Sequence, residues 1–104
     1  MQYWKVAWIH DFIDEPIFIY GELNDEFEEI RTVEMFRDGR LGYASIIGLE
    51  YLTLSSETNW PPKEEIEQDP QFIVEVIPKV EFEKFWIQAI SNNTHIDEWT
   101  PMNE

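Results

Sequence analysis

Residues 30–47 read IRTVEMFRDGRLGYASII, with the pair Asp38-Gly39 in the middle. A two-residue hairpin turn needs positive φ at positions that Asp and Gly tolerate, so this pair is the strongest local signal in the chain. The residues on either side are rich in β-branched, aromatic and aliphatic types, which is typical of strands. We therefore predict an antiparallel hairpin that joins a strand at 27–37 to a strand at 40–47.

The segments before this hairpin also predict strands. Residues 3–9 place large apolar side chains on both faces, with Lys5 as the polar exception, a pattern that suits a central strand covered on both sides. Asp14-Glu15-Pro16 predicts a turn that leads into a strand at 17–23. Asn24-Asp25 predicts the next turn, so the first three strands follow one another as a meander.

After the hairpin the pattern changes from strands to helices. Gly48 predicts a bulge or bend, and residues 49–54 predict a short fifth strand. Pro61-Pro62 precede a short helix with Glu64 and Glu65 in its first turn, where carboxylates are favourable. Asp69-Pro70 end this helix, and residues 72–77 return as a strand or extended segment.

A second helix is predicted from Pro78 to about Ser91. Its apolar residues Phe82, Phe85, Trp86 and Ala89 recur at helical spacing and predict a face that packs on the sheet. The fold class is α+β: an antiparallel β-meander of four to five strands, a short helix, and a C-terminal amphipathic helix packed on one face. We predict one domain over residues 1–93 and a C-terminal tail over 94–104.

Composition limits the possible partners. The 104 residues hold 22 Asp plus Glu against 7 Lys plus Arg, a formal net charge of -15, while 43% hydrophobic residues are enough for a folded core. This charge repels nucleic-acid backbones and anionic lipid surfaces, so neither is an expected partner. It exceeds the magnitude of about 2–8 that suits a small domain, which favours a cationic protein surface as the partner. Without an export signal or a stretch of ~20 apolar residues, the expected location is the cytoplasm.

The sequence carries no pattern that predicts catalysis. It has no cysteine, no nucleophile-elbow motif and no phosphate-binding glycine loop, so we expect no enzyme, no catalytic residues and no cofactor. The densest group of acid-base side chains is His10, Asp11, Asp14 and Glu15. Their spacing matches no metal-ligand pattern, so no metal site is predicted. An alternative stays open, in which His10 and its neighbouring carboxylates form a small-molecule or metal-binding module or an enzyme.

The acidic residues suggest a binding surface instead. No Lys or Arg occurs between Lys5 and Arg31, and the predicted turns in this span gather carboxylates. If the turns lie at the two ends of the second strand, the patch extends along an edge, with aromatic side chains as anchors. The predicted partner-binding residues are Asp11, Asp14, Glu15, Glu22, Asp25, Glu26, Glu28, Glu29, Tyr43 and Trp60.

Two strings carry a family resemblance. YWKVAWIHDFIDEP at residues 3–16 and FRDGRLGYA at 36–44 resemble a bacterial family catalogued as domain of unknown function 6881. PKEEI at 62–66, DPQF at 69–72 and EFEKFW at 81–86 are similar to its acidic C-terminal half, so the resemblance covers about residues 2–90. It implies no activity and no catalytic residues. It does imply a small stand-alone acidic protein, a profile similar to that of immunity proteins that neutralise bacterial toxins.

The leading hypothesis is therefore a stoichiometric binding protein. Most concretely, it is an immunity-type inhibitor whose acidic face covers the basic active-site surface of a cognate toxin such as a nuclease. The sequence leaves the oligomeric state open.

Overall fold

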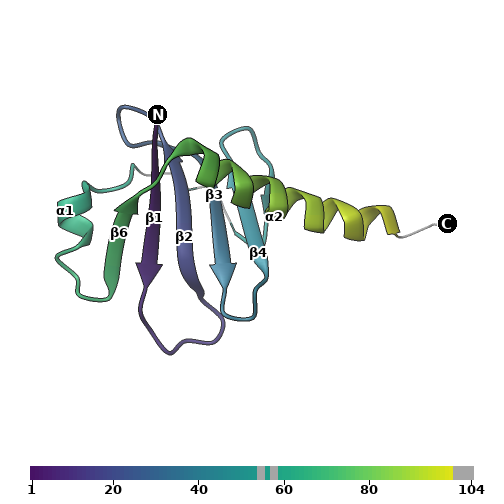
Figure 1. Ribbon diagram of the computed structural model, residues 1–104, viewed down its shortest axis with the longest axis horizontal. Coiled ribbons are helices and arrows are strands. Elements are labelled where there is room, and N and C mark those ends of the chain that lie inside the picture. The colour runs from purple at the N-terminus through teal and green to yellow at the C-terminus, as the bar shows by residue number, and fades with distance from the viewer. Residues whose placement is uncertain (54–55, 57–58, 100–104) are drawn as a thin grey trace.

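The structure is a computed structural model that describes residues 1–53, 56 and 59–99, the last seven of them by backbone alone. The described residues form a six-stranded antiparallel sheet in the order β5-β4-β3-β2-β1-β6, and α2 crosses one face of it (Figure 1). The elements in chain order are β1 (Gln2–Trp8), β2 (Pro16–Leu23), β3 (Glu29–Phe36), β4 (Leu41–Ser45), β5 (Glu50–Tyr51), α1 (Lys63–Ile66), β6 (Phe72–Val76) and α2 (Lys79–Trp99).

The predicted α+β class is confirmed, and the sheet has one strand more than expected. β6 returns to pair with β1, with Val6 opposite Val74 and Trp8 opposite Phe72. This pairing makes β1 an interior strand, as its two apolar faces predicted. β5 is shorter than the predicted 49–54, and Leu54 lies outside the described residues.

The Asp38-Gly39 turn is in the predicted place, but its geometry is different. The Gly39 N–H donates to the Phe36 carbonyl at 2.9 Å, and the Phe36 N–H donates to the Arg40 carbonyl at 2.9 Å. The loop therefore has three residues, and its last residue, Gly39, has φ 93°. This is the three-residue hairpin that needs a left-handed residue at its end. The prediction of a two-residue turn was wrong.

The same geometry recurs at the next turn. The Gly48 N–H donates to the Ser45 carbonyl at 3.0 Å, and the Ser45 N–H donates to the Leu49 carbonyl at 2.8 Å. Gly48 has φ 100° and is a turn residue. For this reason β4 ends at Ser45 rather than at the predicted residue 47.

Replacing Gly39 by Val should lower the free energy of unfolding by about 1–2 kcal/mol, because an L side chain resists the left-handed region. A Cβ at Gly39 would meet no atom within 4 Å, so the loss would come from the backbone and not from a clash. Chemical denaturation measures the change. Gly39→Asn is the matched control and should lose less, since Asn tolerates positive φ. Equal stability of Gly39→Val and the wild type would contradict this assignment of the turn.

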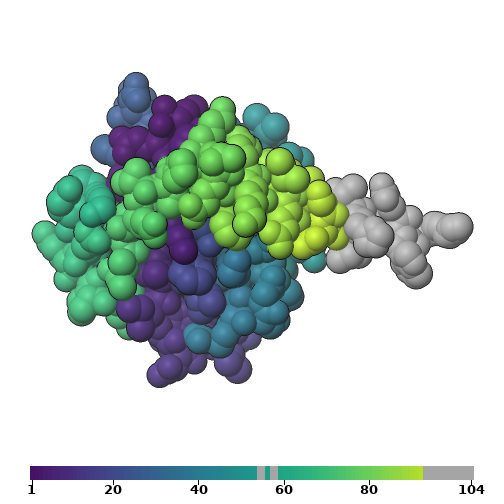
Figure 2. All heavy atoms as spheres, in the orientation of Figure 1, coloured from purple at the N-terminus to yellow at the C-terminus, as the bar shows by residue number. Residues whose placement is uncertain are grey.

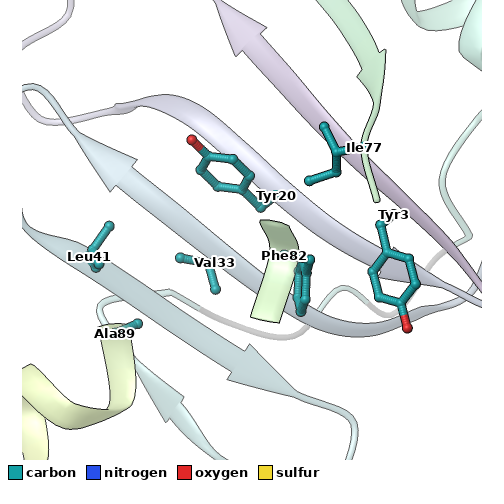
Figure 3. Close-up of a cluster of buried hydrophobic side chains, with 7 residues drawn as sticks. All are labelled: Tyr3, Tyr20, Val33, Leu41, Ile77, Phe82 and Ala89. Atoms are coloured by element: carbon teal, nitrogen blue, oxygen red, sulfur yellow. The ribbon is translucent and has the colours of Figure 1, made fainter. Parts of the chain in front are cut away.

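The predicted apolar stripe of α2 packs on the sheet. Phe82 and Ala89 are fully buried, and Phe85 and Trp86 pack against the same cluster. Figure 3 shows the buried set Tyr3, Tyr20, Val33, Leu41, Ile77, Phe82 and Ala89. α2 continues to Trp99, beyond the predicted end at Ser91, because neither Gly nor Pro interrupts it.

A second core covers the opposite face of the sheet. Trp4, Val6, Leu23 and Val74 are buried there, and the Trp60 ring packs against them. Gly21 makes this possible, because a Cβ at that position would lie 2.5 Å from the Trp60 ring. Trp60, together with Ile66 of α1, therefore covers part of the face that α2 leaves free.

Candidate functional site

The structure divides the predicted acidic patch into two surfaces. β2 lies between β1 and β3, so it is not the edge strand that a continuous patch would need. Asp11, Asp14 and Glu15 lie in the β1–β2 connection, while the carboxylates after Leu23 lie at the other end of β2. The eight residues of β2 separate these ends by roughly 25 Å. This exceeds the Debye length of about 10 Å at 0.1 M salt, so each end acts as a separate charged surface.

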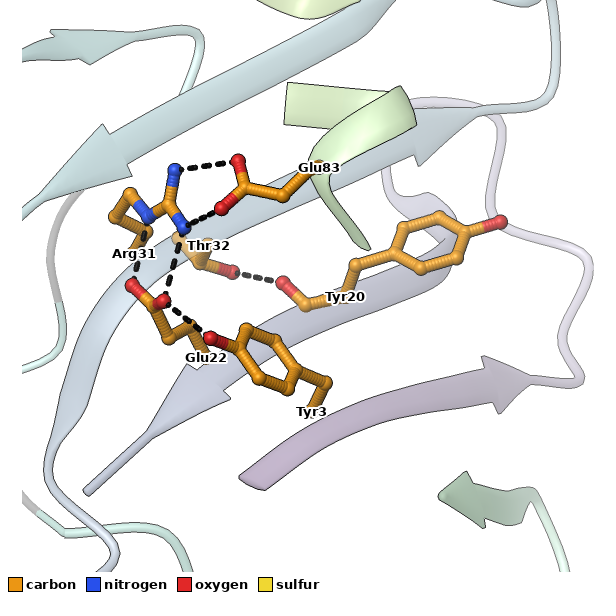
Figure 4. A network of polar contacts seen from close by, with 6 residues as sticks. All are labelled: Tyr3, Tyr20, Glu22, Arg31, Thr32 and Glu83. Carbon is orange, nitrogen blue, oxygen red and sulfur yellow. Dashed lines mark hydrogen bonds and ion pairs between the residues drawn. The ribbon is translucent and has the colours of Figure 1, made fainter. Parts of the chain in front are cut away.

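Glu22 belongs to a buried network rather than to an exposed surface (Figure 4). It accepts hydrogen bonds from the Tyr3 hydroxyl at 2.9 Å and from Arg31 Nε at 2.6 Å and Nη2 at 2.9 Å. Arg31 also donates to Glu83 of α2 at 3.0 and 2.7 Å. These bonds from Arg31 hold the pKa of Glu22 and of Glu83 below the usual glutamate range. The network links α2 to β2 and β3.

Glu29 and Trp60 also have a structural role, because they contact each other. Buried Glu29 accepts hydrogen bonds from Trp60 Nε1 and from the Ser56 N–H, both at 2.9 Å. The Trp60 ring lies 6.2 Å from Trp4, centroid to centroid. This carboxylate therefore fixes the chain before α1 on the sheet and is not free to meet a partner.

Tyr43 is half-buried under α2. Its ring centroid lies 5.7 Å from that of Trp86 and 6.0 Å from that of Tyr51. By contrast, Asp25, Glu26 and Glu28 are exposed in the β2–β3 turn. Of the predicted contact residues, only the carboxylates at the two ends of β2 remain freely accessible.

Residues 9–15, which we call the β1–β2 loop, are held in place by hydrogen bonds that involve His10. His10 Nδ1 accepts the Phe12 N–H at 2.9 Å, and His10 Nε2 bonds to the Pro16 carbonyl at 2.8 Å. Because a carbonyl only accepts, Nε2 carries the proton and the ring is neutral in this arrangement. Arg37 donates to the His10 carbonyl at 2.8 Å. Both ring nitrogens are therefore occupied, which leaves His10 no lone pair for a metal or a substrate proton.

Aromatic rings extend from the sheet to the tip of this loop. The Phe72 and Trp8 centroids are 5.8 Å apart, those of Trp8 and His10 4.3 Å, and those of His10 and Phe12 5.3 Å. At the tip, Phe12 is 59% exposed and Ile13 is 78% exposed. Figure 2 shows the loop, in purple-blue atoms, at the lower end of the molecule. A series of ring contacts therefore leads from the sheet to the exposed apolar side chains at the tip of the loop.

The loop encloses an open hollow. Its volume is about 440 Å³, and it is lined by Trp8, Asp11, Phe12, Ile13, Asp14 and Glu15. The three carboxylates are exposed, and within the described part of the chain no Lys, Arg or His forms an ion pair with them. Uncompensated charge beside exposed apolar surface is typical of a protein-binding site.

Comparison with known proteins gives one match. The sequence profile of the family described as "Domain of unknown function (DUF6881)" matches residues 2–91. The chain belongs to this family. The resemblance seen in the sequence is therefore confirmed. Neither the curated proteins nor the solved structures contain a match to the chain.

In this DUF6881 member, the sequence analysis found the acidic residues of the β1–β2 loop but missed Trp8, Phe12 and Ile13. The signal was present in the string IHDFIDEP at residues 9–16, where large apolar residues alternate with acids in a predicted turn. Turn residues are normally polar, so Phe12 and Ile13 in that position are informative.

Two features of the described residues concern the alternative function, a small-molecule or metal-binding site. Among the described residues, no group of three or more His, Asp or Glu is placed to hold a metal ion. A second cavity of about 240 Å³ lies on the face opposite α2 and has no titratable side chain in its lining of Val6, Ile19, Ser56, Asn59, Trp60, Pro61, Ile66 and Phe72.

No described helix is long and apolar enough to cross a membrane.

Proposed function

We propose that this protein is a stoichiometric binding module, an immunity-type inhibitor that neutralises a bacterial toxin by covering a basic active-site surface, such as that of a nuclease. It acts in the cytoplasm, by binding and not by catalysis. The observation that carries the proposal is the β1–β2 loop, which presents Asp11, Asp14 and Glu15 beside exposed Phe12 and Ile13 on a braced support.

Charge gives the proposed interaction its range. The chain has a net charge of -15, of which the loop contributes three carboxylates, and the guanidinium of Arg37 lies nearby. Nuclease clefts are basic because they bind phosphates, so an acidic surface is attracted to them. Complementary charge mainly accelerates association and selects the partner.

Apolar contact gives the interaction its strength. Interface energy is concentrated in a few buried anchors, and exposed Phe12 and Ile13 can supply them. The His10 hydrogen bonds and the contact of its ring with Trp8 hold the loop before binding, which lowers the entropy lost on association. The apolar residue of the β2–β3 turn, Phe27, packs on Trp4 instead, with the ring centroids 5.6 Å apart.

Capture from a lysate of the source organism at low salt tests this proposal. Tagged wild type is compared with Asp14→Lys/Glu15→Lys and with the matched control Asp25→Lys/Glu26→Lys, which changes the net charge equally at the other end of β2. We expect a specific basic partner that the wild type and the control recover and the loop variant loses. Its recovery should also fall as salt rises, because salt screens exposed charges. Equal recovery by both variants, or recovery of no partner, would contradict the proposal.

His10→Ala separates binding from catalysis in the same experiment. If His10 only braces the loop, this variant should capture less partner but still inhibit it at higher concentration. An activity of the isolated protein that His10→Ala abolishes would contradict the binding proposal and favour an enzyme.

A further inference from the structure

We propose that the hollow of the β1–β2 loop is a receptor for an arginine side chain of the partner. The inference rests on the proposed function for its place in an interface, but the hollow can be tested alone. The hollow is open to solvent and has a volume of about 440 Å³.

The lining has the two chemistries that a guanidinium requires. Asp11, Asp14 and Glu15 offer carboxylate oxygens, which a guanidinium can engage with paired N–H donors. Phe12, whose side chain is 59% exposed, offers an aromatic ring on which its planar group can stack. The same protein already uses this combination in its interior, where Arg31 pairs with Glu22 and Glu83 and lies 5.0 Å from the rings of Phe82 and Trp86.

The site should prefer arginine to lysine. An ammonium is a compact, strongly hydrated charge and gains little from ring stacking, whereas a guanidinium is planar and more weakly hydrated. Without the ring, only the carboxylates would attract the ligand and the two cations would bind alike. A preference for arginine over lysine would therefore show that an aromatic ring takes part in binding.

The experiment is an NMR titration of the full-length ¹⁵N-labelled protein with two capped peptides, acetyl-Gly-Arg-Gly-amide and acetyl-Gly-Lys-Gly-amide. We expect the arginine peptide to shift the Trp8 indole N–H and the backbone amides of Phe12 and Asp14, and to bind several-fold more tightly than the lysine peptide. Phe12→Leu, which keeps the site apolar, should weaken the arginine peptide at least fivefold. Asp14→Asn/Glu15→Gln should do the same, while the control Asp25→Asn/Glu26→Gln should not.

Three results would overturn the inference: no shifts in the loop, equal affinity for both peptides, or shifts of equal size around Asp25 and Glu26. The test is distinguishable from that of the proposed function. If Asp14→Lys/Glu15→Lys abolishes partner capture while the arginine peptide causes no shift, the arginine-receptor inference is wrong and the proposed function stands. If the peptide binds in the hollow while this variant still captures the partner, the arginine-receptor inference stands and the proposed function is wrong.

Discussion

Replacing Arg31 by Met is expected to lower the free energy of unfolding at pH 7 by about 3–5 kcal/mol, the usual cost of removing one partner of a buried ion pair. The guanidinium bridges the carboxylates of Glu22 and Glu83, and its side chain is 19% exposed against 8% for Glu22. Met keeps most of the contact with Phe82 and Trp86. The loss would therefore come from leaving Glu22 buried without its cation. Equilibrium denaturation in urea measures it.

The pH dependence of this variant gives a second readout. In the wild type, hydrogen bonds from Arg31 lower the pKa of Glu22 and Glu83 below 4.5, so their contribution to stability is present above that pH and is lost as pH falls through the lowered values. In Arg31→Met, a buried unpaired Glu22 favours its protonated form. The difference in free energy of unfolding between Arg31→Met and the wild type should therefore shrink as pH falls from 7 towards 4.5.

The double variant Arg31→Met/Glu22→Gln is the control for this mechanism. It removes the unpaired charge, so it should recover much of the stability that Arg31→Met loses at pH 7. A loss below about 1 kcal/mol for the single variant would show that the network of Figure 4 contributes little to stability. A larger loss that does not change with pH would show that the unpaired charge of Glu22 is not its cause.

Replacing Phe82 by Ala is expected to cost about 3–5 kcal/mol. Phe82 is 0% exposed, and its ring centroid lies 5.4 Å from that of Tyr3 on β1. Removal of this ring leaves a cavity where α2 meets the sheet. Thermal and urea denaturation measure the effect, which would be a large part of the roughly 5–15 kcal/mol that stabilises a typical domain.

Ile87→Ala on the same helix is the matched control for Phe82→Ala. Ile87 is 61% exposed, so its truncation should change stability by about 0.5 kcal/mol or less. Similar losses for the two variants would contradict the assignment of the Phe82 face of α2 to the core.

The sequence predicted the parts of the fold that local signals determine. The Asp-Gly turn, the prolines before both helices and the spacing of Phe82, Phe85, Trp86 and Ala89 each specify structure through their own neighbours. The pairing of β6 with β1 joins segments more than sixty residues apart, and no local pattern shows it. The choice between two and three turn residues depends on strand register, which the turn dipeptide alone does not fix.

The candidate site was only partly predictable for a related reason. Glu22 and Glu29 have the same side chain as exposed Glu26 and Glu28, and burial separates them. Strand alternation gives a hint for Glu22, which shares a face with Tyr20, but its partner Arg31 comes from another strand. The bracing role of His10 depends on loop geometry that spacing does not specify.

The most direct test of the central claim is a hydrogen-exchange footprint of the complex with the captured partner. Amide exchange is compared between the free protein and the complex for the β1–β2 loop and for the β2–β3 turn. We expect partner binding to slow amide exchange in residues 9–15 and to leave exchange in the turn around Asp25 and Glu26 unchanged. Protection confined to the β2–β3 turn, with the β1–β2 loop exchanging as in the free protein, would contradict it.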